Sequence, residues 1–206
     1  MNERTEKRML RAAASEFETR DDDGPVIEGY FAVFGQNYEL TSDMSESIAP
    51  GAFRDTLSGD IRALINHDTS LVLGRTTSHT LELREDSRGL WGRIRINPKD
   101  TDAMNLYERV KRGDVSQCSI GFDILNEDVT FDDAGKTHWT INEIKLYEVS
   151  CCTFPAYTET AISARSIERD AIKERATAAW RERMTAKLNK GGHDNGTEGN
   201  DAQEEN

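Results

Sequence analysis

Apolar and polar residues alternate along the middle of this chain in short runs separated by turn-forming residues. The runs predict strands at residues 26–34, 61–67, 71–75, 79–84, 90–96 and 115–125, and one long strand or two at 138–154. Turns are expected at 68–70, 85–89 and 132–135, where Asp, Ser, Thr and Gly cluster. The pattern therefore predicts a mainly β-structured central region.

One segment has the spacing of an amphipathic helix. Residues 100–112 begin with a capping Asp100 or Thr101 and end before Gly113. The apolar face consists of Ala103, Leu106, Tyr107 and Val110. After a long polar loop at 35–47, residues 49–53 are expected to lead into a shorter helix that ends near residues 58–60.

The two ends of the chain differ from this central region. Residues 1–24 are predicted to form a short charged helix, ended by the run of Asp before Gly24. Residues 166–190 are basic and helix-prone, with Ile172, Ala176, Trp180, Met184 and Leu188 spaced every four residues. Residues 191–206 have no large apolar side chain and are expected to be disordered. We therefore expect a single α+β domain at 25–165 with flexible tails.

Composition excludes several classes of protein. The formal net charge of −12 argues against a nucleic-acid binder, which needs a basic surface. No apolar run approaches the roughly 20 residues of a membrane span, and no secretory signal is visible. Three cysteines, two of them adjacent, do not indicate a disulfide framework and fit a reducing cytoplasm.

Three residues in the strand segments carry the chemistry of a serine hydrolase. His67 closes the apolar run that starts at Ile61, Ser119 lies early in the strand at 115–125, and Glu148 is a carboxylate among apolar residues. A serine hydroxyl needs an imidazole to take its proton, and a carboxylate can orient that imidazole. Glu148 is equally able to pair with Lys145 or with an arginine.

Strand alternation separates Ser119 from its neighbours. Ser119 and Gly121 are expected to share one face of the strand, pointing toward a cleft, while Cys118 and the apolar residues share the other. Ser116 is a rival nucleophile without a comparable face. Cys118 is a second rival, since a Cys–His pair is chemically sound, although its position favours a buried, inert thiol.

Other candidate residues are less well placed. His79 and His138 do not adjoin so clear a strand end, and Arg75 is a possible donor to an oxyanion or to the substrate chain. No two His or Cys residues have close metal-ligand spacing, and the Gly-x-Ser-x-Gly, P-loop and Rossmann motifs are absent. No metal or cofactor is expected.

Several sequence blocks, in order, resemble the HK97-type tailed-phage prohead proteases. The match spans about residues 26–165, and its blocks are Gly29–Phe34, Ala49–Phe53, Asn66–Asp68 through Leu73–Arg75, Arg112–Ser116, Ser119–Phe122 and Glu148–Ser150 through Phe154–Tyr157. That family is similar in fold to the herpesvirus assembly proteases, which implies a β-barrel with surrounding helices. By position, the resemblance makes Ser119 the nucleophile, His67 the general base and Glu148 the third member, where the herpesvirus relatives have a second histidine.

The resemblance also implies a role. Such enzymes act inside the assembling prohead in the host cytoplasm, cleave the scaffolding segment of the major capsid protein or a separate scaffold, and trim themselves. Self-cleavage would fall near residues 15–23 or 164–190, and a homo-oligomer is expected. The alternatives are a non-catalytic capsid-assembly or scaffold-binding protein on the same fold, motivated by the polar tails and acidic centre, and a cysteine peptidase using Cys118.

Overall fold

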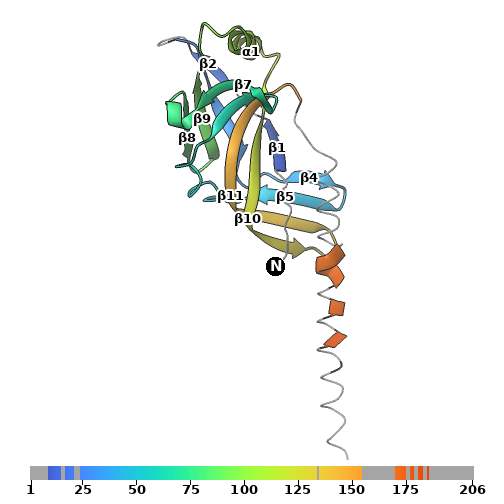
Figure 1. The fold of residues 1–206 in the computed structure, drawn as a ribbon. Coiled ribbons are helices and arrows are strands. Elements are labelled where there is room, and N and C mark those ends of the chain that lie inside the picture. Colours follow the sequence, from blue (N-terminus) through green and yellow to red (C-terminus); the bar gives the residue numbers. More distant parts are fainter. Residues whose placement is uncertain are drawn as a thin grey trace, which may run out of the picture. The chain divides into compact units, whose positions relative to one another are not determined.

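A computed structural model describes residues 9–14, 17–20, 24–133 and 135–154, together with helical residues at 170–174, 177–178, 181–182 and 185. The chain divides into two compact units, Met1–Ile162 and Ser163–Asn206. In the first unit the described residues form two β-sheets and one α-helix (Figure 1). In the second unit they are helical, which agrees with the helix predicted there, and of the predicted apolar stripe only Ile172 is among them.

The larger sheet has seven strands and is built around one long hairpin. The hairpin consists of β10 (Gln117–Phe131) and β11 (Thr137–Cys152), and β1 (Met9–Ala14) pairs antiparallel with β10. The other edge of β11 is shared by two strands that run parallel to it: β5 (Met44–Ile48) on its first half and β6 (Arg62–Ile65) on its second. Strand β4 (Tyr38–Thr41) extends the sheet from β5, and β7 (Asp68–Arg75) extends it from β6.

The smaller sheet has four antiparallel strands. Their order is β2 (Glu18–Arg20), β3 (Val26–Val33), β9 (Gly89–Arg95) and β8 (Leu81–Glu85). The 3₁₀ turn η1 (Thr76–Ser78) connects β7 to β8, and helix α1 (Thr101–Arg112) connects β9 to β10.

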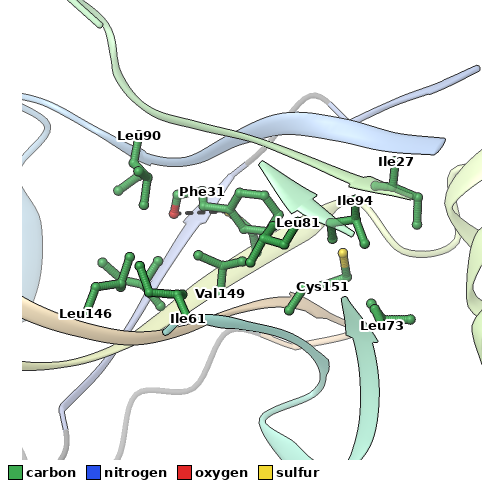
Figure 2. Close-up of a cluster of buried hydrophobic side chains, with 14 of the residues drawn as sticks. Ile27, Phe31, Ile61, Leu73, Leu81, Leu90, Ile94, Leu146, Val149 and Cys151 are labelled. Carbon is green, nitrogen blue, oxygen red and sulfur yellow. Dashed lines mark hydrogen bonds between the residues drawn. The ribbon is translucent and has the colours of Figure 1, made fainter. Parts of the chain in front are cut away.

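The main hydrophobic core brings side chains of both sheets together. Figure 2 shows Ile27, Phe31, Leu81, Leu90 and Ile94 of the smaller sheet beside Leu73, Leu146, Val149 and Cys151 of the larger one. Along β11 the apolar side chains of Val149 and Cys151 belong to this core. Because side chains alternate along a strand, Glu148, Ser150 and Cys152 lie on the opposite face of β11.

Helix α1 confirms the prediction made from its sequence. The Asp100 carboxylate accepts hydrogen bonds from the amides of Asp102 and Ala103, and Gly113 ends the helix in the left-handed conformation with a φ of 83°. All four predicted apolar-face residues are buried. The local sequence was sufficient to predict this helix because both capping residues, Asp100 and Gly113, lie directly beside it.

Several predictions made from the local sequence were wrong. The N-terminal segment contains strands β1 and β2 instead of a helix, and the predicted loop at 35–47 contains β4 and most of β5. Residues 50–58 form consecutive turns with i to i−3 hydrogen bonds and no α-helix. The turn predicted at 68–70 falls two residues earlier, so that β7 begins at Asp68. Pairing of β1 with β10 and of β5 with β11 overrides the local preferences of those two segments.

The described strands agree with the predicted α+β class, a fold that is mostly sheet. The described pairings divide the strands between two sheets, and no pairing that would close a barrel is among them. No helix in the described ranges is long and apolar enough to cross a membrane. Residues 191–206, predicted to be disordered, lie outside the described residues.

Candidate active site

His67 lies in a two-residue turn between β6 and β7. Asn66 and His67 have φ angles of 50° and 64°, so both residues adopt the left-handed conformation. Ile65 and Asp68 face each other across the turn, which makes this a tight hairpin of the primed type. Non-glycine residues rarely adopt positive φ, and such strain is often found at functional sites.

Three hydrogen bonds to the end of β11 and the residue after it hold this turn in place. The Asn66 amide donates to the Cys151 carbonyl oxygen over 3.0 Å, and the Thr153 amide donates to Asn66 Oδ1 over 2.9 Å. The His67 amide donates to Ser150 Oγ over 3.2 Å. The parallel pairing of β6 with β11, which places Ile65 opposite Cys151, brings the turn to this position.

The same pairing joins His67 to Glu148, which is 81 residues away in the chain. His67 Nδ1 lies 2.6 Å from Glu148 Oε1, and the Glu148 side chain is only 1% exposed. Because a carboxylate is only an acceptor, this contact places the ring proton on Nδ1 and leaves the lone pair of Nε2 available. A charge-assisted bond of this kind, away from water, is among the stronger hydrogen bonds in proteins.

Ser119 lies on the face of the sheet that carries this pair. It faces Ser150 across β10 and β11, and Gly121 faces Glu148. Directly opposite residues in an antiparallel pair point to the same side, with Cβ atoms about 4.5–5.5 Å apart. The sheet therefore places Ser119 next to the residue that contacts both His67 and Glu148.

Ser119 differs from its prediction in one respect. Its side chain is fully buried, whereas the sequence predicted that it points outward to a cleft. Within the described part of the chain its Oγ has no hydrogen-bond partner, so the hydroxyl does not contact His67 in this conformation. A buried hydroxyl without a partner costs about 1–3 kcal/mol and requires an explanation, of which a reactive role is one.

Two residues at this site were missed from the sequence, Ser150 and Cys152. Ser150 Oγ donates to Glu148 Oε2 over 2.6 Å, and Cys152 Sγ lies 3.8 Å from His67 Nε2. Burial, and to a lesser degree the nearby Glu148 carboxylate, raises the pKa of Cys152 to about 12. The available signal was the period of two from Glu148 through Ser150 to Cys152, which places all three on one strand face.

The other sequence candidates lie in different surroundings. The Cys118 thiol points to the carbonyl oxygens of Tyr30 and Phe31, on the core face of β10, as predicted for an inert thiol. Arg75 donates from Nε and Nη2 to the Asp60 carboxylate at 2.6 and 2.5 Å, so its side chain is engaged in a surface ion pair. His79 is exposed, and His138 has serine hydroxyls 2.9 Å from each ring nitrogen.

No group of three or more His, Cys, Asp or Glu side chains in the described residues is arranged to hold a metal ion.

Comparisons with known proteins give the family. A relative, the prohead protease of Enterobacteria phage HK97, is 32% identical over 150 residues, which are 71% of this chain and 62% of that protein's length. The capsid assembly protease gp21 of bacteriophage T4 has a solved structure that matches with a TM-score of 0.49 and 14% identity, over 72% of this chain and 98% of that one. The model of the caudovirus prohead serine protease family matches residues 13–175. The chain therefore belongs to the family of caudovirus prohead serine proteases.

Proposed function

We propose that this chain is a serine endopeptidase of phage capsid assembly, with Ser119 as nucleophile, His67 as general base and Glu148 as the group that orients His67. The observation that carries the proposal is the 2.6 Å contact between His67 and Glu148, on the sheet face that also carries Ser119. Membership of the prohead serine protease family supports it.

The residues have the roles that acyl transfer requires. His67 Nε2 takes the proton of the Ser119 hydroxyl as Oγ attacks a peptide carbonyl carbon, and the imidazolium then gives that proton to the leaving amine. Water then hydrolyses the acyl-enzyme: His67 takes a proton from the attacking water molecule and returns it to Ser119 Oγ. Glu148 holds Nδ1–H and stabilises the imidazolium that forms in each step.

The described conformation is not the reacting one. Ser119 is buried, and His67 Nε2 faces Cys152 at 3.8 Å. Catalysis therefore requires that the Ser119 face be uncovered and that Nε2 be brought to its hydroxyl.

The proposed substrates are the phage major capsid protein, through its scaffolding segment or a separate scaffold, and the chain itself. Self-cleavage is proposed near residues 15–23 or 164–190, inside the assembling prohead, and the enzyme is proposed to act as a homo-oligomer. The support for these finer points is the family and the name of the HK97 relative.

A non-catalytic assembly protein is the second candidate function. The observation that favours it is the buried Ser119, whose hydroxyl has no partner among the described residues. On this alternative, His67 and Glu148 stabilise the fold and the chain binds capsid protein without cutting it.

One experiment separates the two functions. The chain is co-expressed with the capsid protein of the same phage, and all chains are measured by intact mass, for wild type, Ser119→Ala and Ser116→Ala. Ser116 is an exposed serine three residues earlier and serves as the matched control. Cleavage by wild type and Ser116→Ala only would support the serine protease, whereas cleavage by all three would exclude Ser119 as the nucleophile.

A reagent that needs no natural substrate completes the test. A fluorophosphonate reacts with an activated serine, forming an Oγ–P bond and releasing fluoride. We expect a single adduct that maps to Ser119 and is lost in His67→Ala. Uncut capsid protein together with an unlabelled chain would favour the assembly protein.

A further inference from the structure

Ser150 contacts both members of the proposed His–Glu pair. Its hydroxyl donates to Glu148 Oε2 over 2.6 Å and accepts the His67 backbone amide over 3.2 Å. The residue is fully buried, and it faces Ser119 across the sheet. It therefore lies between the proposed nucleophile, base and carboxylate.

The chemistry of a hydroxyl fixes the direction of these bonds. A serine hydroxyl has one proton and two lone pairs. The proton is directed to Glu148, and a lone pair receives the amide of His67. Ser150 therefore fixes the carboxylate on one side and the backbone of the histidine on the other.

Each bond has a consequence for the ring of His67. With Oε2 held by Ser150, the other oxygen of Glu148 faces Nδ1 at 2.6 Å. With its amide held, His67 keeps the left-handed φ of 64°, which the residue otherwise adopts at a cost. The direction in which the His67 side chain points therefore depends on both hydrogen bonds of Ser150.

We propose that Ser150 is a positioning residue of this site, which sets the orientation of the His67–Glu148 pair without touching the substrate. The inference rests on the proposed function. Removing the hydroxyl takes away one hydrogen-bond partner of Glu148 Oε2 and one of the His67 amide. The His67–Glu148 pair then loses its alignment. Misplacement of about 1 Å in a catalytic group can cost about 100-fold in rate.

The test compares two side chains of nearly equal shape. Ser150→Thr keeps a hydroxyl, and Ser150→Val replaces it with a methyl group, so any cost of the added bulk is shared by both. We expect kcat on a capsid-derived peptide to fall about 10- to 100-fold from Thr to Val, with little change in KM. Ser150→Ala, which adds no bulk, is expected to behave like Val.

A spectroscopic measurement makes the result independent of activity. The NMR resonance of the His67 Nδ1 proton is recorded in the Ser119→Ala background, which prevents self-cleavage. We expect the resonance to shift upfield or exchange-broaden in Ser150→Val and Ser150→Ala, and to stay near its original position in Ser150→Thr.

Ser47 provides the control. It is a buried serine whose hydroxyl lies 2.9 Å from the Nε2 of His138, and it faces Thr140, far along β11 from Glu148. Ser47→Thr and Ser47→Val should not differ in kcat or in the His67 resonance.

Failure of this inference is distinguishable from failure of the proposed function. Equal kcat and an unmoved His67 resonance in the folded Thr, Val and Ala variants would overturn the positioning role while leaving the protease intact. A fall in kcat with no change in the resonance would overturn it as well. If Ser119→Ala retains cleavage, the proposed nucleophile is wrong, but the resonance still reports whether Ser150 positions His67.

Discussion

Two histidines of this chain lie beside β11 or within it, and their surroundings prepare them for different tasks. His67 has a carboxylate on Nδ1 and a neutral thiol near Nε2, and it sits in a left-handed turn. His138 lies in the regular β11 strand, with the hydroxyls of Ser45 and Ser47 on its two nitrogens.

The difference shows what a general base requires. Both nitrogens of His138 are engaged by serine hydroxyls, which can donate or accept a hydrogen bond. His67 instead has the Glu148 carboxylate on Nδ1, and the weak contact of its Nε2 with Cys152 is easily exchanged for another partner. His138, whose ring nitrogens contact hydroxyls, therefore has the surroundings of a structural histidine. His67, which contacts a carboxylate, has those of a candidate base.

Exchange of the two histidines for alanine should give the largest contrast. We expect His67→Ala to lower kcat/KM by about 10⁴- to 10⁶-fold, because no group remains to take the serine proton. His138→Ala should retain activity and lose stability only. The measurement is cleavage of a capsid-derived peptide together with thermal unfolding of both variants. Comparable losses of activity in the two variants would show that the two histidines do not differ in function.

Removal of the charge on Glu148 comes next. Glu148→Gln keeps the shape but removes the anionic partner of His67, and we expect kcat to fall about 10³- to 10⁴-fold. The matched control is Glu28→Gln, since Glu28 is another buried carboxylate but pairs with Arg20 at 2.8 Å. Equal kcat in Glu148→Gln and wild type would show that the carboxylate only supports the fold.

The raised pKa of Cys152 predicts an unreactive thiol. With a pKa of about 12, the thiolate fraction at pH 8 is about 1,000-fold lower than that of a thiol with a pKa near 9. Alkylation by iodoacetamide, followed by peptide mass analysis, should therefore be slow at pH 8 and accelerate as the pH rises. Rapid alkylation at pH 8 would contradict this and revive a cysteine nucleophile.

The same shift affects stability at high pH. An unfolded chain releases the proton of Cys152 near pH 9, whereas the folded chain keeps it until about pH 12. The unfolded state therefore binds fewer protons in this window, and the free energy of unfolding should fall as pH rises from 9 toward 12. In Cys152→Ala this slope, measured by urea unfolding, should be smaller.

The smallest expected effect concerns the turn that distinguishes His67 from His138. Asn66→Ala loses the bond from the Thr153 amide and puts alanine, which adopts positive φ less readily than asparagine does, at a φ of 50°; we expect a cost of about 1–3 kcal/mol. Asn66→Gly loses the same bond without the strain, so it should be less destabilised. Urea unfolding measures both, and equal stability would show that the strain is negligible.

Much of the fold was predictable because its signals are local. The strands β3, β8 and β9 follow from alternation and flanking turns, and α1 follows from its two caps. Strand β1 was not predictable, since its Met, Leu, Arg and Ala residues favour a helix and only the free edge of β10 makes them a strand. The position of the turn at Asn66 was missed because no glycine marks it.

For the site, the sequence by itself determined the kinds of groups present: a histidine at the end of an apolar run, a serine on one strand face and a carboxylate among apolar residues. Only the tertiary structure decided that His67 meets Glu148, because that contact depends on the parallel pairing of β6 with β11 across more than 80 residues. It also decided that Ser150 and Cys152 join them and that Ser119 is buried. Alternation along a strand is local, whereas the neighbour on the next strand is chosen by the packing of the whole sheet.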